Sequence, residues 1–406
     1  MSVRTCSQSS HSQGRIAQCM AELPNTWDEW IENFGDWQDT VGFDKKWLGD
    51  FELSVLFDWD RAGDQIEFGD YSGRAKWERA LQVPHQSIRD GLISMITVQG
   101  DTEFASVEQQ RHLLASAPTD YDRYAAARIM AEEQRHGWQM AYLLMTYFGQ
   151  QGAREAQKLL ERNAQTGSRL LGAFNRPMPH WLDFYCYTMF VDRDGKFQLG
   201  MLSTSAFKPL AASMGPMLKE ESFHLGTGSN GLRRVIKAGV IPLDMLQRFF
   251  NKWVSTAHDL FGTDSSSSAE WAYVWGIKGR WDERKKLDAE VELDKGVLNE
   301  EGRGHYHDEI VNEVEKLNGY LPESSEQKLF VCHENFNRDI GNFADKRCTL
   351  EGDLFQGDDA EWDSYLANVL PTPADEEQLI ELFKLEWVEN KPMTPRQIAS
   401  GIGVSA

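Results

Sequence analysis

Two stretches of sequence decide the fold: IMAEEQRHGWQM at residues 129–140 and MLKEESFHL at residues 217–225. Each contains the motif Glu-x-x-His, which ends at His136 in the first stretch and at His224 in the second. A spacing of three residues places both side chains of a motif on one face of an α-helix, where they can bind the same metal ion. Apolar residues at helical spacing surround both motifs, so both faces are expected to be buried. A buried charge without a partner would be costly there.

Two further acids lie where a metal site in a four-helix bundle needs them. Such a site takes one lone carboxylate from each of two helices and one Glu-x-x-His motif from each of the other two. Glu103 lies 30 residues before Glu133. Asp192 lies 29 residues before Glu221. Each pair fits a helical hairpin with its carboxylates at the same level. The predicted metal ligands, which are also the predicted catalytic residues, are Glu103, Glu133, His136, Asp192, Glu221 and His224.

Four carboxylates and two imidazoles suit a pair of ions that prefer oxygen-rich, octahedral coordination. Two iron ions are the expected pair, and one manganese with one iron is the alternative. Asp194 is a rival to Asp192, but two residues along a helix turn its side chain to another face. Gln99 lies one turn before Glu103 on the same stripe and is expected to support the ligands.

Four other residues lie close to the predicted ligands in the sequence. Tyr185 and Thr188 share a helical stripe with Asp192, so they are expected either to line a pocket for oxygen or substrate or to belong to the core. Glu132 and Glu220 directly precede the ligand glutamates. They are expected to point to solvent or to lie behind the ligands.

Composition excludes several classes of function. A formal charge of −21 over 406 residues argues against binding to nucleic acid or to an anionic membrane. The five cysteines form no Cys-x-x-Cys pair, so neither a disulfide framework nor a cysteine-bound zinc or iron–sulfur site is expected. The N-terminus lacks the pattern of a signal peptide, and no run reaches the roughly 18 apolar residues of a membrane span. The sequence therefore predicts a cytoplasmic protein.

The chain is predicted to be all-α, with a ferritin-like four-helix bundle, a di-metal core, extra helices and an irregular C-terminal extension. We expect a disordered N-terminus over residues 1–22, an irregular lead-in over 23–80, the di-iron helical domain over 81–290 and an acidic extension over 291–406 that packs on the bundle. Helices are predicted at about residues 92–113, 119–148, 179–206, 215–237, 242–260, 269–286 and 376–387.

Several stretches resemble one known family. They are QGDTE at residues 99–103, ASVEQQRHL at 105–113, LGAFN at 171–175 and DRDGKFQL at 192–199. All four are similar to the oxygenase subunit of benzoyl-CoA 2,3-epoxidase.

This resemblance implies a di-iron monooxygenase of aerobic aromatic degradation. Such an enzyme takes O2 as co-substrate and epoxidises the ring of benzoyl-CoA or a related aryl-CoA thioester. Its electrons come from a separate NADPH-dependent flavin and iron–sulfur reductase. The six predicted ligands match the ligand positions of the family. A CoA substrate also needs basic residues for its phosphates, and Lys278, Arg280 and Arg338 are the candidates.

Three alternatives use the same helices. The first is a di-iron N-oxygenase, hydroxylase or desaturase that acts on a small molecule without CoA. The second is a ferroxidase for iron handling, which predicts a shorter chain and a cage of many subunits. The third is a bundle without metal, which would leave four acids buried without cations.

Overall fold

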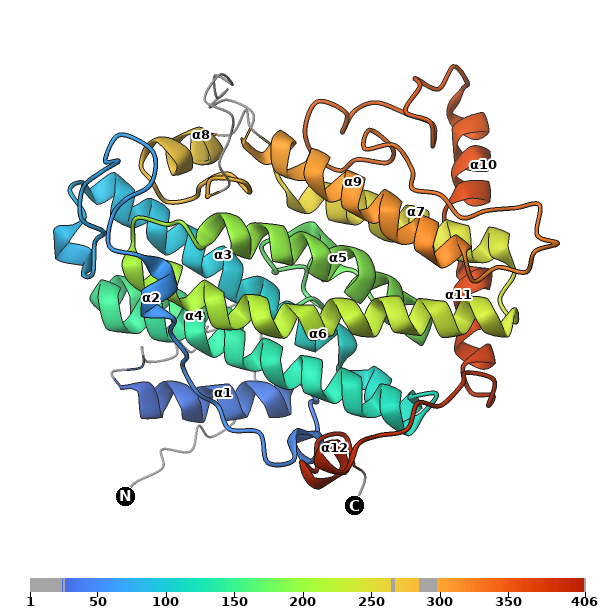
Figure 1. The fold of residues 1–406 in the computed structure, drawn as a ribbon, viewed down its shortest axis with the longest axis horizontal. Coiled ribbons are helices and arrows are strands. Elements are labelled where there is room, and N and C mark those ends of the chain that lie inside the picture. Colours follow the sequence, from blue (N-terminus) through green and yellow to red (C-terminus); the bar gives the residue numbers. More distant parts are fainter. Residues whose placement is uncertain (1–23, 25, 264–266, 285–297, 405–406) are drawn as a thin grey trace, which may run out of the picture.

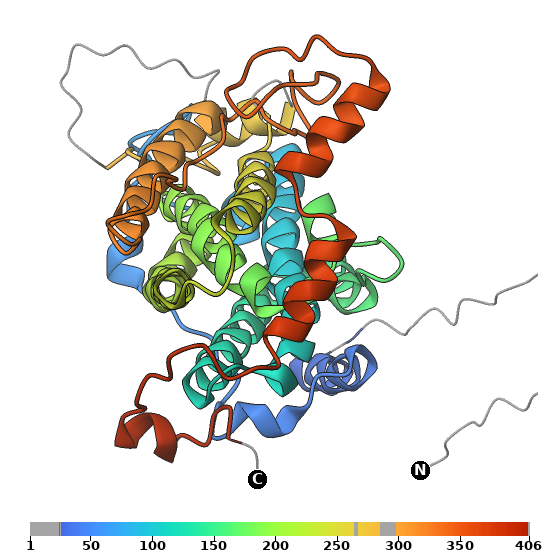
Figure 2. The same ribbon diagram turned by 90° about the vertical axis from the view of Figure 1, so that its right-hand side faces the viewer.

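The computed structural model describes residues 24, 26–263, 267–284 and 298–404, and within them the named elements are all helices (Figure 1). Four long helices form the bundle: α3 (Gln86–Gln110), α4 (Asp120–Glu161), α5 (Trp181–Leu202) and α6 (Lys208–Ala238). α3 packs along α4, α5 packs along α6, and α4 contacts α6, so the bundle consists of two adjoining hairpins. Figure 2 views the bundle after a turn of 90°. The predicted all-α, ferritin-like fold is confirmed.

Shorter helices surround the bundle. α1 packs on α4, α2 on α6, α7 on α5, and α9 on both α5 and α6. The bounds of the outer helices are α1 (Trp27–Val41), α2 (Trp59–Ala62), α7 (Leu243–Leu260), α8 (Ser267–Val274), α9 (Leu298–Asn318), α10 (Asp359–Val369), α11 (Pro373–Leu382) and α12 (Pro395–Ala399). Short 3-10 turns lie at Lys45–Leu48, Ala80–Gln82, Arg111–Ser116 and Gly172–Asn175.

Local signals set the ends of the bundle helices. The Thr119 hydroxyl accepts a hydrogen bond from the Asp122 backbone N–H at 3.1 Å, which caps the start of α4. Pro209 lies in the first turn of α6, where its missing N–H costs nothing. Gly239 ends α6 with φ = 62°, a left-handed conformation that glycine adopts without strain.

Glycines let the helices of each hairpin approach closely. A Cβ at Gly137 of α4 would lie 2.6 Å from the ring of Phe104 on α3. A Cβ at Gly231 of α6 would lie 2.1 Å from the ring of Tyr185 on α5. Both distances are shorter than van der Waals contact, so a larger side chain at either position would push the two helices apart.

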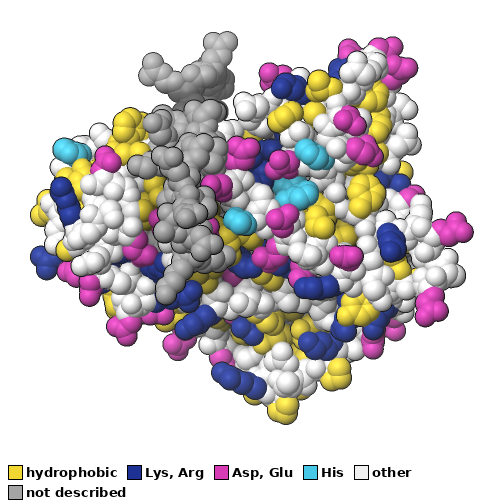
Figure 3. All heavy atoms as spheres, turned by 45° about the horizontal axis from the view of Figure 1, so that its top comes forward, with side chains coloured by type: hydrophobic (Ala, Val, Ile, Leu, Met, Phe, Trp, Pro, Cys, Tyr) yellow, Lys and Arg dark blue, Asp and Glu magenta, His cyan; other side chains and the backbone are white. Residues whose placement is uncertain are grey.

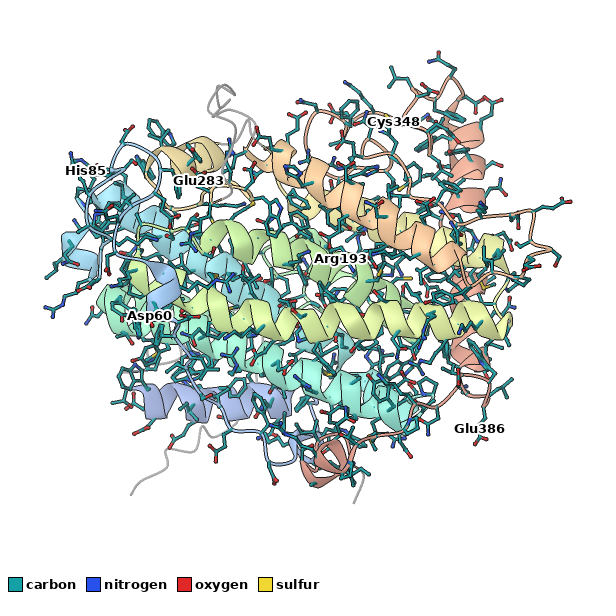
Figure 4. The ribbon with its side chains drawn as sticks, viewed as in Figure 1. Asp60, His85, Arg193, Glu283, Cys348 and Glu386 are labelled. Carbon is teal, nitrogen blue, oxygen red and sulfur yellow. The ribbon has the colours of Figure 1, made fainter. Side chains whose placement is uncertain are left out.

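α9 is clamped against α5 by charged and polar contacts. Arg193 of α5, labelled in Figure 4, pairs with Glu309 of α9, and Lys196 reaches the same carboxylate at 2.7 Å. The Tyr306 hydroxyl donates to the backbone oxygen of Phe190 at 3.1 Å. The bundle is therefore covered on this side by a helix from the C-terminal part of the chain.

Several predicted boundaries differ from the structure. α4 continues from about residue 148 to Glu161, passing Gly149 at φ = 57°, and α6 begins at Lys208 rather than 215. α8 ends at Val274, short of the predicted residue 286. The predicted irregular character beyond residue 291 is wrong for Leu298–Asn318, where α9 forms. The predicted disordered segment 1–22 lies outside the described residues. Among the described helices, none is both long and apolar enough to cross a membrane.

Candidate metal centre

All six predicted ligands point into the middle of the bundle. α3 supplies Glu103, α4 supplies Glu133 and His136, α5 supplies Asp192, and α6 supplies the remaining two. Each of the six is buried. Two overlapping groups have ligand atoms within 4.8 Å of one another: Glu103, Glu133 and His136 in the first, and Glu133, Glu221 and His224 in the second. Glu133 belongs to both, so it lies between two metal-sized positions.

In the half built on α3 and α4, His136 faces the centre with its Nδ1 atom. This atom lies 3.2 Å from Glu103 Oε2 and 3.9 Å from Glu221 Oε1. Glu103 also accepts a hydrogen bond from the Gln99 amide at 2.6 Å. Gln99 therefore contacts a predicted ligand directly.

In the half built on α5 and α6, His224 has the matching orientation. Its Nδ1 atom lies 3.4 Å from Glu133 Oε1, 3.4 Å from Glu221 Oε2 and 3.8 Å from Asp192 Oδ2. Glu221 is therefore shared between the two histidines, as Glu133 is shared between the two groups.

The Nε2 atom of each histidine contacts a glutamate from the other hairpin. Glu220 of α6 lies 2.7 Å from Nε2 of His136, and Glu132 of α4 lies 3.1 Å from Nε2 of His224. A carboxylate that holds Nε2–H leaves Nδ1 free to bind a metal ion. Glu132 and Glu220 are each paired in turn with an arginine from α4, Arg128 and Arg135 respectively.

The acids of the centre titrate very differently. Burial opposes ionisation of Glu103, but the charge of His136 and hydrogen bonds from His136 and Gln99 lower its pKa to about 2. Burial and the negative charge of Glu103 raise the pKa of Glu133 well above its usual value. Burial also raises the pKa of Asp192 well above its usual value, although the nearby His224 works in the opposite direction. Four carboxylates this close cannot all stay ionised unless cations lie among them.

The donor set fits a pair of metal ions. Asp192 Oδ2 and His224 Nδ1 are buried and have no hydrogen-bond partner, although both face the other ligand atoms. Orphaned buried acceptors of this kind are rare in proteins unless they bind an ion or water. Oxygen-rich ligands with two imidazoles suit iron or manganese better than a zinc site that prefers sulfur or more histidine.

A cavity of about 750 Å³, counted with its mouth, ends on the four carboxylates of the centre. Its other walls come mostly from α3, α5 and the segment before α5, and include Met95, Val191, Leu199 and Phe174. Apolar side chains make up much of this wall, with polar ones such as Gln99 and Gln198 among them, and a mainly apolar pocket with a few polar groups suits a small organic substrate.

A buried arginine positions the loop that closes one wall of this cavity. Arg169 donates hydrogen bonds to Asp101 at 3.1 Å and to Glu108 at 2.9 Å, both on α3. The backbone N–H of Leu170 donates to the same Asp101 at 2.7 Å. These bonds hold Leu171 and Phe174 against the cavity.

The other predicted pocket residues lie away from the cavity wall. Tyr185 and Thr188 are fully buried, and neither is among the lining residues. The Thr188 hydroxyl donates to the backbone oxygen of Phe184 at 2.9 Å. Tyr187 lines the cavity instead, as does Asp194, whose carboxylate accepts from Gln198 at 3.0 Å. The sequence offered one sign of these two lining residues, since Tyr187 and Asp194 are polar and lie within about one and a half helical turns of Asp192.

The three basic residues proposed for CoA phosphates are already bound to other groups. Lys278 donates to Gln198 at 2.7 Å, Arg280 pairs with Asp282 at 2.5 Å, and Arg338 pairs with Asp259 at 2.5 Å. All three are buried. Figure 3 shows acidic and basic side chains interspersed over the face that contains α9.

Four carboxylates and two imidazoles gather inside the helical bundle beside a cavity, in the arrangement that carboxylate-rich metal proteins built on four helices use to hold two ions. Comparison with known sequences then gives the family. The chain belongs to the phenylacetic acid catabolic protein family, whose model matches residues 78–346. The resemblance read from the sequence is thereby confirmed.

Two characterised relatives narrow the activity. The chain is 35% identical over 418 residues to benzoyl-CoA oxygenase component B of Aromatoleum evansii, which covers 89% of this chain and 87% of that protein. It is 25% identical over 239 residues to one subunit of the 1,2-phenylacetyl-CoA epoxidase of Escherichia coli (strain K12), which covers 58% of this chain and 70% of that protein. The chain is accordingly an enzyme of the oxygenase class, as predicted.

Proposed function

We propose that the chain is the oxygenase component of a di-iron monooxygenase that epoxidises the ring of benzoyl-CoA or a related aryl-CoA thioester. The observation that carries this proposal is the cavity that ends on four buried carboxylates, which in turn lie beside two buried histidines. The names of both relatives support an aryl-CoA substrate and an oxygenase or epoxidase reaction.

The contacts support an arrangement of the proposed ligands around two iron positions. Glu103 and His136 would hold one ion, and Asp192 and His224 would hold the other. Glu133 would lie between them, because it belongs to both groups of ligand atoms. Glu221 would also lie between them, because it faces the Nδ1 atoms of both histidines.

The protein prepares the site for oxygen chemistry in three ways. The carboxylates offset the charge of two cations, and Glu132 and Glu220 keep a proton on Nε2 of each histidine. The apolar side chains of the cavity wall would limit water at the place where the substrate ring would lie. When bound, the two iron ions would supply electrons and open coordination positions for activating O2.

A separate electron donor completes the proposal. One relative is named as a component and the other as one subunit of an epoxidase, so each is part of a larger enzyme. We infer that this chain likewise receives electrons from a separate NADPH-dependent flavin and iron–sulfur reductase.

One observation favours a second candidate, an oxygenase of the same family that acts on a small molecule without CoA. Lys278, Arg280 and Arg338 are engaged with internal partners, so none of them extends freely toward solvent to bind phosphate. A CoA thioester would need other basic side chains.

Metal analysis followed by rapid kinetics tests both candidates. The protein is reconstituted with ferrous iron without oxygen, reduced, and mixed with O2 in a stopped-flow spectrometer with and without benzoyl-CoA. Two irons per chain and oxygen kinetics that depend on benzoyl-CoA are expected. Two irons with no response to benzoyl-CoA would favour the second candidate, and a chain that binds no iron would refute the proposal.

A further inference from the structure

A surface groove lies directly outside the half of the centre that contains His136. Its walls are the segment 56–60, which includes the start of α2, and its floor is formed by Pro216, Lys219 and Glu220 of α6. It measures about 940 Å³ with its open side. Figure 4 labels Asp60 where α2 lies beside α6.

A proline inside α6 fixes the wall of this groove. Pro216 has no N–H, so the backbone oxygen of Ala212 lacks its partner within the helix. The backbone N–H of Asp58 donates to this oxygen at 2.8 Å instead. The segment is thus bonded to the helix that carries the metal ligands, and the groove is a built feature of the surface.

The groove exposes large apolar side chains. Trp59 is 44% exposed and Leu56 is 40% exposed. The ring of Trp59 stacks on Phe57 with the centroids 4.6 Å apart, which holds it in place. Rigid exposed aromatic side chains in a concave surface are typical of protein–protein interfaces.

The floor of the groove leads to the metal centre through two side chains. Glu220 contacts His136 Nε2 at 2.7 Å, and Nδ1 of the same ring faces Glu103 at 3.2 Å. The Glu220 side chain is 20% exposed, whereas Glu132 is 7% exposed. The side chains of the four acidic ligands are between 5% and 7% exposed. Among the described acids of the centre, Glu220 is thus the one that comes nearest to solvent.

The corresponding position on the other hairpin is covered. Glu132, which holds His224, is paired with Arg128 at 2.9 Å. The guanidinium of Arg128 lies 3.9 Å over the ring of Phe223. An approaching protein would meet this arginine and ring before it met the carboxylate, so the two hairpins differ in access.

We propose that this groove is the docking surface for the electron-donating protein. Asp58, Asp60 and Glu220 outnumber Lys219 there, and the whole chain carries a charge of −21, so the partner presents a basic rim around an exposed cofactor edge. In each cycle the donor's reduced flavin or iron–sulfur cofactor would lose two electrons and the two bound metal ions would gain them, with no covalent bond formed to the protein. This inference rests on the proposed function, because it requires an enzyme that is reduced from outside.

Two substitutions in the groove test the proposal without touching a ligand: Trp59→Ala and Asp60→Lys. Their matched controls are Trp271→Ala, which removes an equally exposed tryptophan (44%) stacked on Trp275, and Asp363→Lys on α10. Turnover of the iron-loaded protein is measured against the concentration of an NADPH-dependent flavin and iron–sulfur reductase. Each variant is also reduced with dithionite and methyl viologen and followed through one turnover.

Both groove variants are expected to raise the half-saturating reductase concentration by about tenfold or more, as for an interface hot spot. The controls and the chemically reduced turnover should stay within twofold of the unsubstituted protein. Groove variants that match their controls with the reductase would overturn the docking surface. So would a change of oligomeric mass in Trp59→Ala with unaltered reductase dependence, because the groove would then bind a second copy of the chain.

Failure of the proposed function has a different signature. In that case the unsubstituted protein turns over with neither electron source. Docking is then read from the affinity of the reductase for the protein, measured by calorimetry whether or not the protein binds iron. A loss of about tenfold in Trp59→Ala supports the surface, and equal affinity in Trp59→Ala and Trp271→Ala refutes it.

Discussion

The two halves of the metal centre share a sequence pattern but not an environment. In the half on α3 and α4, Glu103 accepts from Gln99 at 2.6 Å and lies 3.2 Å from His136. In the half on α5 and α6, Asp192 has an oxygen without a hydrogen-bond partner and lies 3.8 Å from His224. Protein side chains give Glu103 its hydrogen-bond partners in the first half, whereas the unpartnered oxygen of Asp192 in the second half depends more on a cation.

The supports behind the histidines differ as well. Glu220 is partly open to a surface groove, and Glu132 is shielded by Arg128 and Phe223. The two hairpins therefore differ in access, because the support of His136 reaches a surface groove and the support of His224 lies behind an arginine and an aromatic ring. Under the proposed docking, this difference would let electrons enter on the side of Glu220.

The largest expected effect comes from removing the residue that both halves share. Glu133→Ala deletes a carboxylate that belongs to both groups of ligand atoms, so both metal positions should weaken. We expect the chain to bind fewer than two irons and turnover to fall by more than about 100-fold, because even residues behind a ligand are worth about 10- to 100-fold. Metal analysis and turnover measure the change. A variant that keeps two irons and its activity would remove Glu133 from the site.

Helicity serves as the control for Glu133→Ala. The substitution shortens one buried side chain in α4, and alanine is a good helix former. The far-ultraviolet circular dichroism should therefore stay close to that of the unsubstituted protein. His224→Ala should also lose turnover while keeping its helices, but it should spare part of the first half.

The next effect separates the two histidine supports. Glu132→Gln and Glu220→Gln each remove the charge that holds a proton on Nε2, and each should lower iron affinity by about 10- to 100-fold. Glu132→Gln should cost more, because its side chain is 7% exposed and water cannot replace the lost charge as well as it can at Glu220. Competition with a chelator gives the affinities, with the exposed Glu326→Gln as control. Equal affinities in all three variants would show that the supports are dispensable.

The sequence predicted the bundle and its six central residues because both are local patterns. Apolar stripes mark long amphipathic helices, and the Glu-x-x-His spacing places two ligands on one helix face wherever the helix packs. The distance along the chain from each lone acid to the next Glu-x-x-His motif is nearly the same in both halves, which predicted two helical hairpins. The fold and the composition of the centre were therefore readable from residue spacing alone.

Features that depend on distant contacts were not predicted. Leu171 and Phe174 become a cavity wall only because Arg169 binds two acids of α3. The engagement of Arg338 with Asp259 likewise joins residues far apart in the chain. α9 did carry a signal, since Tyr306, Ile310, Val314 and Leu317 are buried at helical spacing, but Gly302 and Gly304 and many charges masked it.

The smallest expected effect is a change in the free energy of unfolding. It tests the difference between the halves most directly, because the two halves should respond differently to metal. In metal-free protein at pH 7, Glu103→Gln should lower the free energy of unfolding by about 1–2 kcal/mol. The folded-state pKa of Glu103, about 2, lies below its ordinary value of 4.5, so its carboxylate stabilises the fold above that pH and the contribution fades as pH falls toward 2. Asp192→Asn should instead raise the stability by a similar amount. The folded-state pKa of Asp192 lies well above 3.8, so its ionised form opposes folding at neutral pH.

Bound iron should reverse the effect of Asp192→Asn on stability but not the effect of Glu103→Gln. With two irons bound, Asp192 becomes a ligand that holds a cation, and Asp192→Asn should then melt below the unsubstituted protein. Glu103→Gln should be less stable in both states, because it loses its contact with His136 without metal and a ligand with metal. Thermal unfolding of the three proteins, each with chelator and with ferrous iron, gives the six values needed. If Asp192→Asn lowers the melting temperature of the metal-free protein as Glu103→Gln does, the two halves are equivalent and the unpartnered oxygen of Asp192 has no energetic meaning.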